Sequence, residues 1–183
     1  MHHYIAFLRG INLGNRRIKM DDLQALFVAM KFADVATFIA SGNVIFASKN
    51  GDSHKLEQQI QRHLQKSLGY AVDTFVRTRA EVTAVAAFQP FAPAVMSHPD
   101  HTVHAGLLGE ALDTETARKL ESIRTEVDEF RVEGREYYWL CRIKTHESKV
   151  WSLPALKALK LPSSSMRNLT TVRKLAALYP SVG

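Results

Sequence analysis

Two short stretches of this chain combine glycine with side chains that donate hydrogen bonds. Residues 9–14 (RGINLG) follow an apolar segment, and residues 41–43 (SGN) lie between two further apolar segments. Glycine lets backbone N–H groups come close to a ligand, and guanidinium groups bind carboxylates and phosphates through short, charge-assisted hydrogen bonds. Both stretches are therefore typical of an anion-binding edge, although the glycines are also explained if they only shape turns.

A third stretch, Arg167-Asn168, precedes an apolar-periodic segment at residues 169–179. Asparagine is a good N-cap residue, and capping is sufficient to explain Asn168. An arginine next to a helix N-terminus also adds a guanidinium fork to the free N–H groups there. This stretch is the strongest remaining candidate for an anion site.

Other familiar chemistries are not supported by the spacing of the residues. The glycines at 10 and 14 are wrongly spaced for a dinucleotide fingerprint, and there is no Walker motif. Ser41 lies between predicted strands, which is the wrong context for a nucleophile elbow. The sequence names no nucleophile and no general base, so catalytic residues and any reaction class stay open.

The histidine-rich segment 98–104 has no standard metal-ligand spacing, so we expect no metal site and no cofactor. The single cysteine, Cys141, lies within the apolar segment YYWLCRI, and we expect it to be a buried core thiol. With one cysteine the chain cannot form an internal disulfide, which fits a reducing cytosol.

The 183 residues are 46% hydrophobic and 23% charged, which is the profile of a globular protein. No apolar run approaches the length needed to span a membrane, and the N-terminus does not resemble a secretory signal. We therefore expect a cytoplasmic protein with no membrane partner.

The net charge of +6 is concentrated in two segments. Residues 141–183 carry eight basic side chains and one acidic side chain, and residues 1–20 carry four basic side chains and no acidic one. These segments either form two solvated faces or are joined by folding into one surface that attracts anions. Composition alone does not decide between the two.

Hydrophobic periodicity predicts a β-α-β-β-α-β order in the first half, followed by a helix. This is the split βαβ order of the ferredoxin-like fold. A capping box, Thr78 with Glu81, marks the start of the last helix. The predicted strands are residues 4–10, 34–40, 43–48 and 71–77, and the predicted helices are 20–32, 52–68 and 78–88.

A loop with Pro90, Pro93 and Pro99 separates this half from a second one, so we divide the chain into halves at 1–89 and 90–183. The second half is predicted as β-α-β-β-α-α. Its elements are a strand at 102–109, a helix at 113–123, a hairpin at 127–143, a helix at 150–159, and a helix at 167–179 in place of a last strand. The fold class is thus α+β, with two ferredoxin-like halves packed together and the second half ending in helices.

This topology explains why the first two stretches belong together. In the βαββαβ order, strand three lies beside strand one, so the end of strand one and the turn between strands two and three meet at one edge of the sheet. Both faces of the first and third strands are apolar, which predicts that the second half covers the free face of the first sheet. The predicted core contains Ile5, Phe7, Leu23, Leu26, Phe27, Ile39, Val44, Phe46, Leu56, Ile60 and Leu64.

Four separated motifs carry a resemblance to a known family. They are residues 9–27 (RGINLGNRRIKMDDLQALF), 41–48 (SGNVIFAS), 148–150 (SKV) and 166–175 (MRNLTTVRKL). Together they resemble the bacterial family known as domain of unknown function 1697. The resemblance spans nearly the whole chain and implies two ferredoxin-like halves. It implies no reaction, because no biochemical function is established for that family.

The sequence departs from the family pattern at Asn15, where a second glycine is usual, at Met166, where a small residue is usual, and at Leu169, where an aromatic is common. The other motif positions match the family pattern. They are Arg9, Gly10, Asn12, Gly14, Lys19, Met20, Ser41, Gly42, Asn43, Lys149, Arg167, Asn168, Thr171 and Lys174.

The leading interpretation is a binding protein or enzyme that recognises an anionic, phosphate-bearing small molecule. Its expected site is one edge formed by the loop at residues 9–14, the turn at 41–43 and the helix start at 167–168. The alternatives are a nucleic-acid-binding module, which fits the basic segments, and a protein-interaction module without a ligand. The expected ligand-binding residues are Arg9, Gly10, Asn12, Lys19, Ser41, Gly42, Asn43, Lys149, Arg167 and Asn168.

Overall fold

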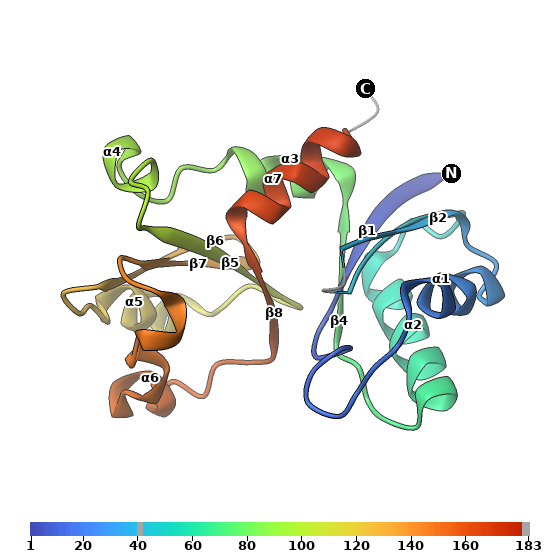
Figure 1. The fold of residues 1–183 in the computed structure, drawn as a ribbon, viewed down its shortest axis with the longest axis horizontal. Coiled ribbons are helices and arrows are strands. Elements are labelled where there is room, and N and C mark those ends of the chain that lie inside the picture. Colours follow the sequence, from blue (N-terminus) through green and yellow to red (C-terminus); the bar gives the residue numbers. More distant parts are fainter. Residues whose placement is uncertain (40–41, 181–183) are drawn as a thin grey trace. The chain divides into compact units, whose positions relative to one another are not determined.

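The computed structural model describes residues 1–39 and 42–180. The chain divides into two compact units, the first formed by residues 1–84 and 175–183 and the second by residues 85–174. Each unit contains a four-stranded antiparallel sheet with helices (Figure 1), which confirms the predicted α+β class with two similar halves. The predicted division at residues 89 and 90 stays a prediction. Within the described ranges, no helix combines the length and apolar character that crossing a bilayer requires.

The first unit contains sheet A, with the strand order β2-β3-β1-β4. The central strand β1 is antiparallel to both β3 and β4, and β3 separates β1 from β2, as the ferredoxin-like order predicts. The strands are β1 (His2–Leu8), β2 (Ala33–Phe38), β3 (Asn43–Ser48) and β4 (Thr74–Thr78). The helices of this half are α1 (Met20–Ala29), α2 (Ser53–Leu68) and α3 (Arg79–Ala87).

Local sequence explains where these helices begin and end. The side chain of Asp52 accepts a hydrogen bond from the backbone N of Lys55 at 3.1 Å and caps α2, which ends at Gly69 with a left-handed φ of 79°. Helix α1 ends earlier than predicted, at Ala29 instead of residue 32, because Lys31 adopts a positive φ of 62°.

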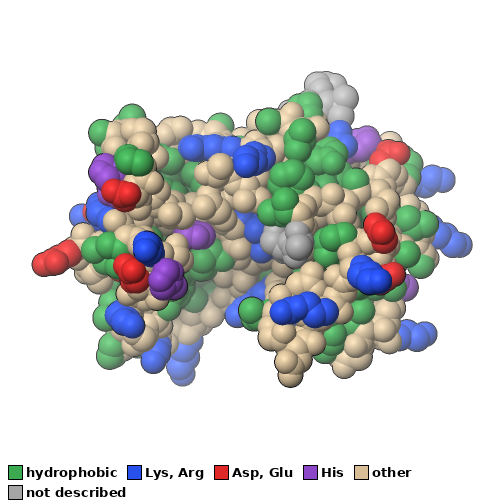
Figure 2. Space-filling model, in the orientation of Figure 1, with side chains coloured by type: hydrophobic (Ala, Val, Ile, Leu, Met, Phe, Trp, Pro, Cys, Tyr) green, Lys and Arg blue, Asp and Glu red, His purple; other side chains and the backbone are tan. Residues whose placement is uncertain are grey.

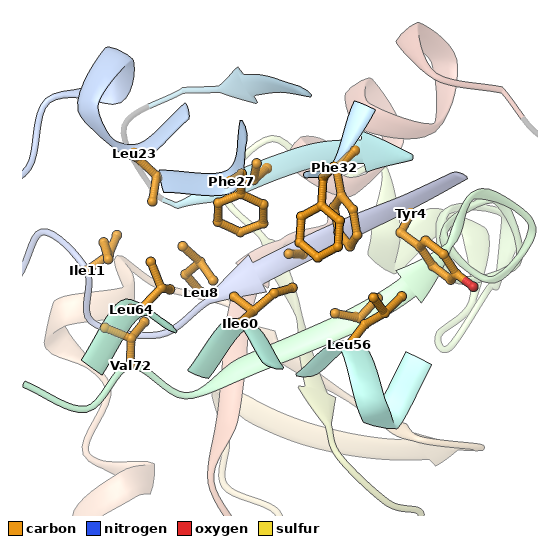
Figure 3. Packing of buried hydrophobic residues seen from close by; sticks show 14 residues of the cluster. Tyr4, Leu8, Ile11, Leu23, Phe27, Phe32, Leu56, Ile60, Leu64 and Val72 are labelled. Atoms are coloured by element: carbon orange, nitrogen blue, oxygen red, sulfur yellow. The ribbon is translucent and has the colours of Figure 1, made fainter. Parts of the chain in front are cut away.

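Alternate residues of sheet A and the inner faces of α1 and α2 form the core of the first unit. Figure 3 shows Leu56, Ile60 and Leu64 along one side of α2, with Phe27 of α1 on the other side of the cluster. Ten of the residues expected in the core are buried or partly buried. Ile39 is the exception: it is 52% exposed, and its φ of 51° shows that the chain leaves the strand there, so the prediction for Ile39 is wrong.

The second unit contains sheet B, with the equivalent order β6-β7-β5-β8. Its strands are β5 (Thr102–Leu108), β6 (Asp128–Glu133), β7 (Glu136–Cys141) and β8 (Ser164–Asn168). The prediction that this half lacks a last strand is wrong, because residues 164–168 pair with β5. The polar run of Ser163, Ser164 and Ser165 hides this strand in the sequence, since only its pairing with β5 defines it.

The helices of the second half are shorter than the sequence suggests. The predicted helix at 150–159 is a 3-10 turn, η2 (Val150–Ser152), followed by α6 (Pro154–Ala158), because Pro154 starts a new helix. The remaining elements are α4 (Pro93–Met96), α5 (Thr114–Ser122), η1 (Thr145–Glu147) and α7 (Leu169–Leu178).

The two sheets repeat the same hydrogen-bonding pattern. In sheet A, Ile5 of the central strand pairs with Arg77 of β4, and in sheet B, Ala105 pairs with Arg167 of β8. The capping residue of the next helix follows each arginine. Helices α3 and α7 therefore start at equivalent positions of the two halves.

Helix side chains cover backbone groups on the outer strands of both sheets. A strand at the edge of a sheet exposes N–H and C=O groups that would otherwise pair with another chain. Three such contacts run from Val76 N to Glu57 Oε1 (2.8 Å), from Gln24 Nε2 to Val35 O (2.8 Å) and from Val132 N to Glu121 Oε1 (2.9 Å).

We predict that Phe27→Ala lowers the free energy of unfolding by about 3–5 kcal/mol, because it leaves a cavity at a fully buried site. Urea denaturation measures the loss. Val28→Ala is the matched control, since Val28 is next to Phe27 on α1 but 53% exposed, and it should cost less than about 0.5 kcal/mol. Equal losses for the two variants would contradict the assigned inner face of α1.

Candidate functional site

Residues 9–14 and the turn before β3 meet at one edge of sheet A. Leu8 N donates a hydrogen bond to Gly42 O at 2.8 Å, and Phe7 pairs with Asn43. On the other side of β1, Arg9 N donates to Asp73 O at 2.9 Å. The expected meeting of these two stretches is therefore observed for the described residues, while Ser41 lies outside them.

Gly42 is required by the close approach of the two stretches. Its φ is 76°, and a Cβ atom at this position would lie 2.7 Å from Ile11 Cγ2 and 3.1 Å from Leu8 Cβ. Ile11 is 2% exposed and belongs to the same core cluster as Leu64 and Val72 (Figure 3). The turn and the end of β1 are thus locked together by packing.

The loop between β1 and α1 is held in shape by its own polar groups. Asn12 Oδ1 accepts a hydrogen bond from Ile18 N at 2.8 Å and closes the loop. Arg16 stacks over the ring of Tyr70, with its guanidinium carbon 4.3 Å from the ring centroid. Arg9 and Lys19 are exposed at the two ends of the loop, where their charges face solvent.

Asn43 contributes to the fold of the turn. Its side chain is fully buried, and its Nδ2 donates to Phe38 O at 3.0 Å. Gly10 has a left-handed φ of 69°, which suits glycine at the start of the loop. Of the residues that the sequence predicts here, Arg9 and Lys19 present charge to solvent, and Asn12, Gly42 and Asn43 shape the edge.

A buried carboxylate positions the segment around Lys149 in the second unit. Asp128 is 1% exposed, and its Oδ1 accepts hydrogen bonds from Trp139 Nε1 and Ser148 Oγ, both at 2.8 Å. Its Oδ2 accepts from Thr125 Oγ1, also at 2.8 Å. Ser148 is thereby fixed to the hairpin, and the next residue, Lys149, is exposed at the start of η2. No sequence pattern predicts this network, because its members follow no regular spacing.

Cys141 is a core thiol, as expected. It is fully buried, and its Sγ lies 3.3 Å from Ile143 O. Burial raises the pKa of the thiol, and the nearby Asp128 charge raises it further. The thiolate is the reactive form of cysteine, so this environment disfavours nucleophilic chemistry.

Arg167 is a buried cation on β8. It is 9% exposed, and its Nη1 donates to Ser165 Oγ and to Met166 O, both at 2.9 Å. Burial lowers the pKa of its guanidinium to about 10, so the group is still protonated at neutral pH. Its equivalent Arg77 donates in the same way to Val76 O at 3.1 Å.

A small pocket lies at the start of α7, within the second unit. Asn168 Oδ1 accepts a hydrogen bond from Thr170 N at 2.8 Å, as an N-cap residue does. The pocket has a volume of about 80 Å³. Its lining is Met96, His101, Thr102, Val103, Asn168, Leu169, Thr170 and Arg173.

Two pocket residues, Arg173 and His101, were not predicted as site residues. The sequence suggested that Arg173 only complements a solvated helix face. For His101 it suggested only a metal ligand, which the spacing of segment 98–104 does not support. Arg173 Nε donates to Ala86 O at 3.2 Å. Among the residues that the structure describes, the two Nη groups of Arg173 have no hydrogen-bond partner. The two side chains lie far apart in the sequence and meet at the pocket because β5 pairs with β8.

The equivalent helix in the first half already has an anion at its start. The carboxylate of Glu81 accepts a hydrogen bond from Thr78 N at 2.7 Å, and Glu81 N donates to Thr78 Oγ1 at 3.1 Å, which confirms the capping box at α3. When Arg77 is aligned with Arg167, Glu81 corresponds to Thr171. Helix α7 has no acidic residue in its first turn, so its positive end keeps its charge.

His104 lies on β5 opposite Asn168. Its ring stacks on Trp139, with centroids 5.1 Å apart and an interplanar angle of 24°. Its Nδ1 is buried without a hydrogen-bond partner among the described residues, and burial lowers the pKa of this imidazole. In the described part of the chain, no cluster of three or more histidine, cysteine or acidic side chains is arranged to hold a metal ion.

Comparisons with known proteins place the chain in a family. A family model described as "Protein of unknown function (DUF1697)" matches residues 1–138. The chain belongs to the DUF1697 family. The matched part contains the two stretches at the edge of sheet A, while the SKV and RN stretches lie beyond it. The comparison with curated proteins gave no match.

One solved structure shares the fold of this DUF1697 protein over its full length. It is that of the conserved bacterial protein SP0830 from Streptococcus pneumoniae, with a TM-score of 0.75 and 19% sequence identity. The similarity covers 99% of each chain. It shows that both halves of the fold occur together in that protein too.

We predict that Gly42→Ala destabilises the protein more than Gly14→Ala does. Both positions have positive φ, which costs about 1–2 kcal/mol with a side chain present, but only Gly42 lacks space for a Cβ atom. Overpacking against Ile11 should add about 1–3 kcal/mol in urea denaturation. If Gly14→Ala is equally destabilising, the contact between the turn and Ile11 does not constrain the edge.

We predict that His104 makes the protein less stable in acid. Because its folded pKa lies below the ordinary value of 6.5, the unfolded chain takes up the proton first. This contribution to stability is fully present above pH 6.5 and is lost as the pH falls toward the folded pKa. His104→Phe keeps the aromatic contact with Trp139, and it should show a shallower loss of stability below pH 6.5 in urea denaturation. If both proteins lose the same stability below pH 6.5, the assignment to His104 is contradicted.

Proposed function

We propose that this protein binds an anionic, phosphate-bearing ligand, whose anionic group occupies the pocket at the start of α7. The observation that carries the proposal is the pocket itself. It brings the guanidinium of Arg173 to the N-terminal turn of a ten-residue helix. Backbone N–H groups and a guanidinium fork are the donors that phosphate groups use most readily.

The charge of the pocket supports an anion as its occupant. None of its eight lining residues is acidic, while Arg173 is a permanent cation and His101 gains a charge when protonated. The equivalent helix start in the first half holds the carboxylate of Glu81. The fold therefore accommodates an anion at this position in one half through its own chain, and we propose that a ligand supplies it in the other.

Other predicted residues retain a place in the proposal. Arg9 and Lys19 in the first unit and Lys149 in the second are exposed cations. Figure 2 shows Lys and Arg side chains at several places on the face that it displays. They are suited to attract an anion over a distance. Arg167 is buried, and its role in the proposal is to add positive charge next to Asn168.

We assign a binding function to this pocket and assign no reaction to it. The only cysteine is buried with a raised pKa, and the pocket contains no carboxylate that could serve as a general base. Among the residues that line the pocket, only His101 has a side chain suited to acid–base or nucleophilic catalysis.

Nucleic acid is the second candidate ligand, favoured by the loop between β1 and α1. This loop exposes Arg9, Arg16, Arg17 and Lys19, and no acidic residue occurs among residues 1–20. Binding to a phosphate backbone would weaken steeply with salt. A single-stranded oligonucleotide titrated at two salt concentrations separates this candidate from a small ligand, because a weak salt dependence argues against it.

We predict that Arg173→Gln removes most of the stabilisation that phosphate gives to the folded protein. Loss of a charged hydrogen bond should cost about 1.5–3 kcal/mol of binding free energy. Calorimetric titration with inorganic phosphate measures it, at constant ionic strength. Lys174→Gln is the matched control, since it removes the same charge from an adjacent exposed position of α7 that does not line the pocket. If both variants bind phosphate alike, the pocket is not the site.

A further inference from the structure

The size of the pocket restricts which part of a ligand it can hold. Its volume is about 80 Å³, whereas one water molecule in the liquid occupies roughly 30 Å³. The space is large enough for one tetrahedral oxyanion. The rest of a larger ligand would extend outside, which suits an anionic group at the end of the molecule.

The hydrogen bond of His101 decides which ring nitrogen carries the hydrogen in the neutral imidazole. Its Nδ1 lies 2.9 Å from Val95 O, and a carbonyl oxygen only accepts hydrogen bonds, so Nδ1 carries the hydrogen. In the neutral ring, Nε2 is then an acceptor. It becomes a second donor only when the ring takes up a proton.

Several charged or titratable groups lie around His101. The ring of His98 stacks on it with centroids 4.1 Å apart, and Asp100 precedes it, with its backbone N bonded to His98 Nδ1 at 3.2 Å. Arg173 of α7 lines the same pocket, while Met96 of α4 and Thr102 and Val103 of β5 bring no charge. An anion bound between Arg173 and His101 would favour a positive charge on the imidazole.

An oxyanion and a neutral Nε2 are a poor match, because both offer only lone pairs. A protonated His101 instead donates to the anion alongside Arg173. Binding of a fully charged oxyanion and uptake of a proton are therefore linked, and each strengthens the other.

We propose that the ligand is a phosphomonoester, or a similar terminal dianion, that binds together with a proton on His101. This inference rests on the proposed anion-binding function and deepens it. A phosphodiester has substituents on both sides of the phosphorus and a single charge. Its single charge does not match a pocket in which two cations face the anion.

Sulfate is the probe for the proton, because it stays doubly charged over the whole range from weakly acidic to weakly basic pH. Calorimetric titrations of the full chain run from pH 5.5 to 8.5 at constant ionic strength. For the parent protein, the dissociation constant for sulfate should fall by about tenfold or more toward low pH, since a neighbouring opposite charge shifts a titration by 1–3 units. His101→Gln should bind with the parent's high-pH affinity and show no such dependence.

Two control variants locate the proton. His146→Gln removes an exposed histidine of η1 outside the pocket, and it should leave the pH dependence intact. His98→Gln removes the stacked neighbour and should also retain the dependence. If the dependence disappears in His98→Gln and persists in His101→Gln, the assignment of the proton to His101 is overturned.

A second set of titrations tests the class of the ligand. Methyl phosphate should bind at pH 7 and dimethyl phosphate should not, and equal binding of the two overturns the proposed class. Sulfate binding that requires Arg173 and is independent of pH would overturn the proton linkage and leave the anion-binding function in place. Absence of binding by sulfate and methyl phosphate at every pH would overturn both.

Discussion

The antiparallel pairing of a central strand with both of its neighbours fixes where the loop of the first unit and the pocket of the second unit lie. In sheet A, the end of β1 meets the starts of β3 and β4, and this brings Leu8 to Gly42 and Arg9 to Asp73. In sheet B, the start of β5 meets the end of β8, and this brings the residues before Val103 to the start of α7. The loop at one sheet and the pocket at the other follow from the same topology, at opposite ends of the central strand.

The pocket can be interpreted by comparing the equivalent helix starts of the two halves. Both halves place an arginine on the last strand, a capping side chain after it and a helix after that. They differ in what faces the first turn of the helix, because α3 has Glu81 and α7 has no acid there. A repeated fold thus allows a comparison within one chain, in which the self-capped helix shows what the other helix lacks.

Much of the fold could be predicted from the sequence, because local patterns define most elements. Strand β3 has the predicted limits, and α2 begins after its cap Asp52 and ends before Gly69. Strand β8 could not be recognised, since its serine-rich sequence shows no apolar alternation and only pairing with β5 makes it a strand. Ile39 was misplaced for a related reason: its apolar side chain suggested burial, but a positive φ turns the chain out of β2.

The candidate site was predictable only where the strand order or the type of a single residue indicated its parts. The meeting of residues 9–14 with Gly42 followed from topology, and Asn168 was recognisable as a cap from its type. His101 and Arg173 were not, because they are brought together by the register of β5 and β8, and no local pattern encodes that register. Buried roles, such as those of Asn43 and Arg167, also depend on packing that the sequence does not display.

The side chains that cover the outer strands have a consequence for the behaviour of the protein at high concentration. Glu57, Gln24 and Glu121 occupy backbone groups that could otherwise recruit a strand from a second molecule. Each of them comes from a helix that packs on its own sheet, so the protection exists only once that helix has docked. A newly made chain is therefore most prone to self-association before its helices are in place, and the finished fold is shielded by the same contacts that complete it.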